Sequence, residues 1–177
     1  MHRNLIITQF LCAGILLFII SGCSKSDDQR EFENEALAVP NGITETSANG
    51  STIGNIDDND WRVGPMYRGL IQLESQISDY PHPNPMGFNQ NLTIQLKFNS
   101  TDVVNGIEIR KFRLPSDSNY PQLRLLQQDE LSSSIENITI EGNIIAEGQG
   151  ESARDIYRIM IYDGNQNLIS YGDVQIE

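Results

Sequence analysis

The stretch Leu92-Thr93-Ile94-Gln95-Leu96-Lys97-Phe98 decides the fold class. Its apolar side chains occupy every second position, and polar side chains lie between them. Successive side chains of a β-strand point to opposite faces of a sheet, so this pattern predicts a strand with one buried face and one face in water. A strand of this kind needs a second layer to cover its apolar face.

The sequence on either side of this stretch predicts further strands. They are expected at Gly69–Leu73, at Ile107–Ile109 continuing out of phase through Phe112 and Leu114, at Leu123–Leu126, at Ile135–Ile145 as one long or two short strands, at Ile156–Tyr162 and at Leu168–Ile176. The change of phase predicts a β-bulge near Arg110-Lys111. Ile156 to Tyr162 is apolar on both faces apart from Arg158, which is typical of a central strand, and Asp163-Gly164-Asn165 predicts the turn after it. With no convincing helix, these features predict an all-β domain, a two-sheet β-sandwich of about seven strands over residues 61–177.

The N-terminus has the layout of a secretory signal peptide over residues 1–22. Arg3 supplies a positive charge, and the apolar run from Leu5 to Ile20 is shorter than the ~20 residues of a membrane-spanning helix. The residues that follow, Ile20-Ser21-Gly22-Cys23, resemble the lipobox of bacterial lipoproteins. The resemblance implies that a diacylglycerol is attached to the Cys23 sulfur, that a peptidase cuts before Cys23, and that a fatty acid such as palmitate acylates the new amino group. The alternative is an uncleaved anchor helix that happens to contain a cysteine.

Cleavage before Cys23 would restrict the chemistry of the mature chain. Cys23 would be its only cysteine, and His82 its only histidine. A cysteine-ligated zinc and a thiol nucleophile are therefore excluded, and no second histidine can complete a site around His82. We predict no catalytic residues and no cofactor apart from the covalent lipid. A small hydrolase that uses paired carboxylates is the enzymatic alternative, because spacing in sequence does not fix their separation in space.

The charge of the chain limits its partners. The formal net charge is −12, with nine acidic and two basic residues between Ser24 and Asp60. Both this segment and the domain after it would repel phosphate backbones, so we expect no nucleic acid partner. Anionic headgroups would be repelled as well, and we expect the acyl chains on Cys23 to provide the membrane attachment.

Residues 23–60 are predicted to be the lipidated cysteine and a disordered tether. The segment is polar and acidic, and its apolar residues follow no helix or strand period. Its start, Ser24-Lys25-Ser26-Asp27-Asp28, resembles the acidic export signal that sends lipoproteins of some Gram-negative bacteria to the outer face of the outer membrane. The resemblance implies a lipid-anchored, surface-exposed protein of the outer membrane. The alternative is an ordinary solvated linker.

A second resemblance concerns the domain itself. Tyr80-Pro81-His82-Pro83-Asn84-Pro85, followed by the alternating strand, resembles the start of Ig-like domains in secreted bacterial proteins, including the sorting domains of the type-nine secretion system. Tyr157 to Asn165 is similar to the penultimate strand and turn of these modules. The likeness covers roughly residues 80–177 and implies an Ig-like fold. It implies no particular activity, because this fold carries many functions.

Three groups of residues are candidates for binding. Arg110, Lys111, Arg113 and Arg124 form a basic cluster that could meet an acidic protein or the carboxylates of a polysaccharide. Trp61 could belong to an aromatic platform for sugars, although a role in capping the core is favoured. Asp57, Asp58 and Asp60 offer oxygen ligands for calcium, but their spacing does not match an EF-hand loop, so we favour no metal.

Together these features predict a non-catalytic binding or envelope-accessory module anchored in the outer membrane. A structural subunit that pairs with a partner by β-strand augmentation is the alternative from another class. An unpaired first or last strand would favour that alternative.

Overall fold

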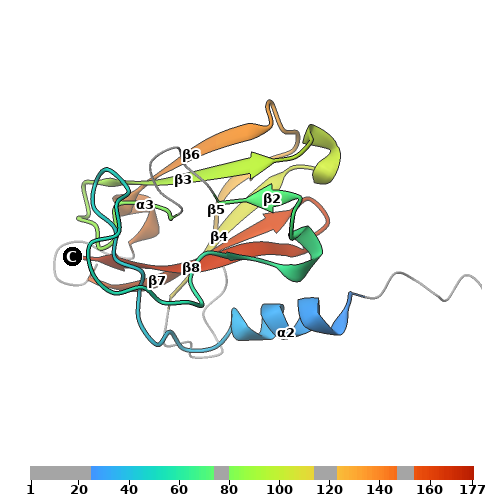
Figure 1. The fold of residues 1–177 in the computed structure, drawn as a ribbon. Helices are drawn as coiled ribbons and strands as arrows, with labels where there is room; N and C mark the ends of the chain where they lie inside the picture. Colours follow the sequence, from blue (N-terminus) through green and yellow to red (C-terminus); the bar gives the residue numbers. More distant parts are fainter. Residues whose placement is uncertain (1–24, 74–79, 114–122, 147–153) are drawn as a thin grey trace, which may run out of the picture.

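Two antiparallel β-sheets face each other across an apolar core (Figure 1). The computed structural model describes residues 25–73, 80–113, 123–146 and 154–177. One sheet has the strand order β1-β8-β7-β4-β5, and the other has the order β2-β3-β6. The strands are β1 (Arg62–Val63), β2 (Ile71–Gln72), β3 (Asn91–Phe98), β4 (Ile107–Arg113), β5 (Leu123–Gln128), β6 (Ile135–Glu141), β7 (Asp155–Asp163) and β8 (Leu168–Ile176). The predicted all-β, two-sheet fold class is confirmed, with eight strands in the described part of the chain in place of about seven.

The alternating stretch forms β3, the middle strand of the smaller sheet. Leu92, Ile94, Leu96 and Phe98 all face the core and are buried. On one side β3 pairs with β6, where Ile94 lies opposite Ile138. Both strands therefore contribute one apolar face to the same core, as their period of two predicts.

The stretch from Ile156 to Tyr162, which is apolar on both faces, forms β7, the middle strand of the larger sheet, as predicted. It is hydrogen-bonded to β4 on one side and to β8 on the other. Tyr157, Ile159 and Ile161 belong to the main core, whereas Met160 packs on the opposite face of the sheet. The register of β4 against β5 shifts between Ile109 and Arg110, which confirms the predicted irregularity at this point.

The turn between β7 and β8 is built around one carboxylate. Asp163 Oδ1 accepts hydrogen bonds from the backbone N–H groups of Asn165, at 2.9 Å, and of Asn167, at 2.7 Å. A side chain that accepts hydrogen bonds from the backbone two residues ahead is the usual reason for Asp in turns. The turn predicted from Asp163-Gly164-Asn165 is therefore confirmed.

Two strand predictions need correction. Of Gly69–Leu73, only Ile71–Gln72 forms a strand, and Ile144 and Ile145 lie in the short helix α3 (Gly142–Ile145). The Lys111 ammonium donates hydrogen bonds to the carbonyl oxygens of Ile144 and Ile145, both at 2.9 Å. These carbonyls have no partner within a helix that ends there, so a lysine from β4 satisfies them.

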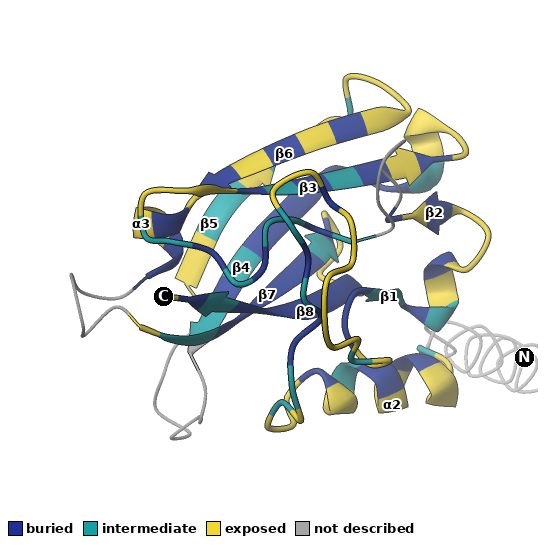
Figure 2. Cartoon of the chain, turned by 60° about the vertical axis from the view of Figure 1, so that its left-hand side comes forward, coloured by how far each residue is buried: buried dark blue, intermediate teal, exposed yellow. Residues whose placement is uncertain are grey.

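The disordered tether predicted up to Asp60 is wrong for residues 25–60, which the structure describes as folded. Helix α2 (Asp27–Glu35) lies across the larger sheet on the face opposite the core (Figure 2). The Ser26 hydroxyl caps the helix by accepting a hydrogen bond from the Gln29 N–H at 3.2 Å. Phe32 and Ala36 are buried against Met160, Leu168 and Tyr171, in a small cluster separate from the main core.

Candidate functional site

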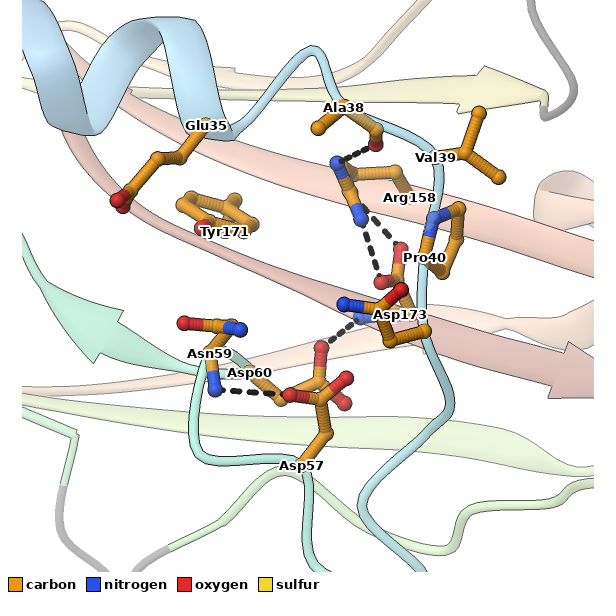
Figure 3. A pocket seen from close by; sticks show the side chains of 11 residues that line it. Glu35, Ala38, Val39, Pro40, Asp57, Asn59, Asp60, Arg158, Tyr171 and Asp173 are labelled. Atoms are coloured by element: carbon orange, nitrogen blue, oxygen red, sulfur yellow. Dashed lines mark hydrogen bonds and ion pairs between the residues drawn. The ribbon is translucent and has the colours of Figure 1, made fainter.

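A pocket of about 130 Å³ lies where the segment after α2 crosses the larger sheet (Figure 3). Its walls come from the end of α2, from the 57–60 turn and from the outward-facing side chains of β7 and β8. The pocket is lined by Glu35, Ala38, Val39, Pro40, Asn41, Asp57, Asn59, Asp60, Arg158, Tyr171 and Asp173. Three of these side chains, Asp60, Arg158 and Asp173, are charged and buried.

Arg158 joins the sheet to the helix. Its Nε and Nη2 donate to the two carboxylate oxygens of Asp173, at 2.8 and 2.6 Å. Its Nη1 donates to the carbonyl oxygens of Ala36, at 2.8 Å, and Ala38, at 2.6 Å. Arg158 is only 3 % exposed. The cation therefore satisfies carbonyls at the C-terminal end of α2, where a positive charge is favourable.

Asp60 fixes the other side of the pocket. Its two carboxylate oxygens accept hydrogen bonds from the backbone N–H groups of Thr44, at 2.8 Å, and Asp173, at 3.0 Å. Burial, together with the nearby Asp173 carboxylate, raises the pKa of Asp60 to about 7. Burial also raises the pKa of Asp173, although the Arg158 guanidinium opposes this shift. Asp60 is therefore the carboxyl group of this pocket that resists ionisation near neutral pH, whereas Asp173 is paired with the Arg158 guanidinium.

Asn84, in the loop before β3, also connects the N-terminal segment to β8. Its side-chain N–H₂ donates to the carbonyl oxygens of Thr44, at 2.9 Å, and Asp173, at 2.8 Å. Its Oδ1 accepts from the backbone N–H of Gln175 at 3.0 Å. Because Asn84 is completely buried, these three side-chain hydrogen bonds help fix the N-terminal segment to β8.

The groups around this pocket bond mainly to one another. The Arg158–Asp173 pair is bidentate, and Asp60 accepts two backbone hydrogen bonds. Within residues 25–73, 80–113, 123–146 and 154–177, no cluster of three or more histidine, cysteine or acidic side chains is arranged to hold a metal ion. The geometry therefore locks the N-terminal segment onto the sheet and can retain a proton at neutral pH.

The raised pKa of Asp60 predicts a pH dependence of stability. A group whose pKa is higher in the folded state stabilises that state at low pH, and this contribution is lost as pH rises through the folded value. We expect the free energy of unfolding to fall by about 1–3 kcal/mol between about pH 5 and about pH 8. Urea denaturation at the two pH values measures this difference in the free energy of unfolding. Asp60→Asn should flatten this decline, whereas Asp58→Asn, at an exposed position, should not. An unchanged slope in Asp60→Asn would contradict this assignment.

The predicted basic cluster does not form a free basic patch. Arg110 and Arg124 both donate to Glu108 Oε1, at 2.9 and 2.8 Å, and hydrogen bonds from Arg110 and Gln166 lower the pKa of Glu108 to about 2. Lys111 is buried, and its ammonium caps α3. Arg113 ends β4, and its side chain lies outside the described part of the structure. The prediction of one shared binding surface is wrong, because neighbouring residues of a strand point to opposite faces.

Trp61 is not a binding platform either. It is buried in the main core, and its ring packs directly on Gly172 of β8. A Cβ atom at position 172 would lie 2.2 Å from this ring, so only glycine leaves room for it. The alternative role that the sequence favoured, a cap on the core, is confirmed.

The calcium candidates Asp57, Asp58 and Asp60 differ in how far they are buried. Asp60 is buried among backbone donors, and Asp58 is exposed. Asp57 Oδ1 accepts from the Asn59 backbone N–H at 2.9 Å, within its own turn. Asp57 and Asp60 both line the pocket, but among the described residues these carboxylates do not form a cluster of three that could hold a metal ion.

The lipobox residues Ile20 to Cys23 and the neighbouring Ser24 lie outside the described residues. Lys25, Ser26, Asp27 and Asp28 are described, and they start α2. Ser26 is the N-cap, and Asp27 and Asp28 stand in the first turn, where acidic side chains favour the helix dipole. Lys25 pairs with Glu33 at 2.7 Å. This part of the export-signal candidate therefore also has a structural role.

The sequence did not predict the buried polar cluster of Arg158, Asp173, Asp60 and Asn84, which connects the N-terminal segment to β7 and β8. One signal was present, because Arg158 is the only cation in an otherwise apolar central strand. A buried arginine requires a buried acceptor. Which acceptor it uses depends on the register of β7 against β8, where Arg158 lies opposite Asp173.

Comparison with known proteins adds little. No family model matches the sequence, and no curated protein matches it. Among solved structures, the fold is similar to that of a superoxide reductase (neelaredoxin) from Ignicoccus hospitalis, with a TM-score of 0.35 and 8 % identity over 61 % of this chain and 80 % of that chain. A likeness at this level does not bear on function. Among the described residues, no helix has the length and apolarity needed to cross a membrane.

Proposed function

We propose that this protein is a non-catalytic lipoprotein of the outer membrane, exposed at the cell surface, where it binds a protein or a polysaccharide or supports other envelope components. The observation that carries the proposal is the lipobox-like sequence Ile20-Ser21-Gly22-Cys23 behind a short apolar run. Attached acyl chains anchor a protein with ~0.8 kcal/mol per buried CH₂ group, so two or more chains hold it stably. The neighbouring sequence, from Ser24 to Asp28, supports transport to the outer face.

The fold supports a binding or accessory role over catalysis. The charged side chains of the described pocket are committed to holding the N-terminal segment against the sheet. Strand β8, the last strand, is paired with β7 and with β1, and the remainder of its outer edge bonds to Asp60, Asn84 and Met86. This coverage gives no support to strand augmentation at β8.

The test follows fatty-acid incorporation in cells that process lipoproteins. Cys23→Ser should abolish incorporation of labelled palmitate and leave an uncleaved precursor, because only a thiol can form the thioether. Cys12→Ser is the matched control, since this cysteine lies in the predicted signal peptide, and its labelling should equal that of the wild type. External protease should digest the wild-type protein in intact cells. A Cys23→Ser protein that is still labelled and cleaved after Gly22 would overturn the proposal, and full protection from the protease would overturn its surface location.

A further inference from the structure

Two large apolar side chains are exposed in the short loop before β2. The 3₁₀ helix η1 (Pro65–Tyr67) and the turn after it present Met66 and Leu70, which are 40 % and 43 % exposed. Arg68, between them, is exposed and forms no ion pair with any residue that the structure describes. At a membrane interface, apolar side chains of this kind can leave water while a neighbouring cation meets lipid phosphates.

This loop holds its apolar side chains outward on a fixed backbone. Tyr67 is buried, and its hydroxyl donates to Asp163 Oδ2 at 2.7 Å. The Leu70 N–H donates to the Tyr67 carbonyl at 2.9 Å, which closes the turn. Since the loop is pinned by a buried aromatic residue, the exposure of Met66 and Leu70 belongs to the folded structure.

The loop lies beside the start of α2. The Met66 N–H donates to Gln29 Oε1 at 3.2 Å, and the Gly64 backbone packs closely against Phe32. Figures 1 and 2 both show η1 next to the N-terminal end of this helix, at the opposite end of the sandwich from α3.

The lipid anchor would enter the membrane at the same end. Cys23 precedes Lys25 by two residues, so their Cα atoms are separated by at most roughly 7 Å. Lys25 is held by its ion pair with Glu33 in α2. An acylated Cys23 therefore leaves the domain little freedom to move away from the bilayer surface.

We propose that the loop Pro65–Leu70 is a second membrane contact, in which Met66 and Leu70 enter the interface of a phospholipid bilayer and Arg68 meets lipid phosphates. This inference rests on the proposed lipid anchor. Two apolar side chains bind a bilayer weakly by themselves, but the anchor raises their effective concentration at its surface. The contact therefore orients the domain, with α3 directed away from the membrane.

The charge distribution favours this orientation over one in which α2 lies flat on the membrane. The exposed side chains of the helix include Asp27, Asp28, Glu31 and Glu35. Such an acidic surface is repelled by anionic lipids, whereas the loop carries a cation. Leu37 and Val39, beyond the other end of α2, are also exposed and provide an internal comparison.

The experiment uses the full lipidated protein in phosphatidylcholine vesicles that contain a nitroxide-labelled lipid. Because the Cys23 sulfur is consumed by the thioether, Met66→Cys, Leu70→Cys, Val39→Cys and Ile144→Cys each offer one reactive thiol for an environment-sensitive fluorophore. We expect lipid quenching at positions 66 and 70 to exceed that at positions 39 and 144 at least about twofold. These positions are exposed, and thermal unfolding of each labelled variant checks that the fold is kept.

Each other outcome is decisive. Vesicle-bound protein with equal quenching at all four positions would overturn the second contact and leave the anchor intact. Stronger quenching at position 39 would mean that the domain lies on its α2 side, which also overturns it. Protein that carries no lipid and fails to float with the vesicles would overturn both the anchor and the contact. Positions 66 and 70 that are shielded from an aqueous quencher but not reached by the lipid quencher would reveal a protein occupant and overturn the membrane assignment.

Discussion

Replacing Arg158 with alanine is expected to destabilise the protein by about 3–5 kcal/mol, because it leaves a buried charge without its partner. The bidentate pair with Asp173 would be lost, and that carboxylate would stay buried beside Asp60. The carbonyls of Ala36 and Ala38 would also lose their donor. Chemical denaturation at pH 7 measures the loss. Brief proteolysis should in addition cut the segment after α2 faster than in the wild-type protein.

Two further variants separate the buried pair from a general effect of removing a cation. Arg124→Ala removes an arginine whose side chain is 57 % exposed, so it should cost at most about 1 kcal/mol. Adding Asp173→Asn to Arg158→Ala should recover part of the stability, because it removes the uncompensated charge. A loss below about 1 kcal/mol in Arg158→Ala would show that water reaches this site and that the buried polar cluster does not hold α2.

The sheets were predictable from sequence because their side-chain period is a local property. In β3, polar and apolar residues alternate without interruption, and in β7 both faces are apolar. In each strand, the pattern of apolar residues indicates which of its faces are buried. The pairing of the strands was not predictable, since it depends on contacts between segments far apart in the chain.

The N-terminal segment was mispredicted because its stability comes from elsewhere in the molecule. Only Phe32 and Ala36 of the helical region are apolar and buried, and their partners Met160, Leu168 and Tyr171 lie more than a hundred residues later. Acidic composition and scattered apolar residues are typical of disorder when they are considered locally. Tertiary packing of a short amphipathic helix overrides that tendency.

The basic cluster was mispredicted for a reason that the sequence already contained. Arg110 and Lys111 are neighbours in a strand, so their side chains project from opposite faces. In the structure, Arg110 lies over the Tyr162 ring at 4.6 Å, while Lys111 reaches across to α3. Proximity in sequence is therefore a poor guide to a shared surface within a strand.

The folded N-terminal segment changes what a surface lipoprotein of this kind would present. A free 37-residue tether would have a root-mean-square span of roughly 35 Å, which would leave the domain without a defined orientation. With α2 starting four residues after Cys23, the end of the sandwich that carries η1 would stay close to the membrane. The end that carries α3 would then face outward, and this is where we would seek a protein or polysaccharide partner.

Leu96→Ala is expected to cost about 2–5 kcal/mol, because Leu96 is fully buried in the middle strand of the smaller sheet. Its side chain lies in the core shared by the two sheets, so truncation leaves a cavity in addition to the lost burial. Ile135→Ala, on the neighbouring strand, is the matched control. It removes a similar apolar side chain that is 44 % exposed, and it should cost less than about 1 kcal/mol. Urea denaturation of both variants at one pH gives the comparison. Similar small losses for the two would mean that β3 does not turn its leucine and isoleucine side chains to the core, and the pairing of Leu96 with Glu136 in this register would have to be abandoned.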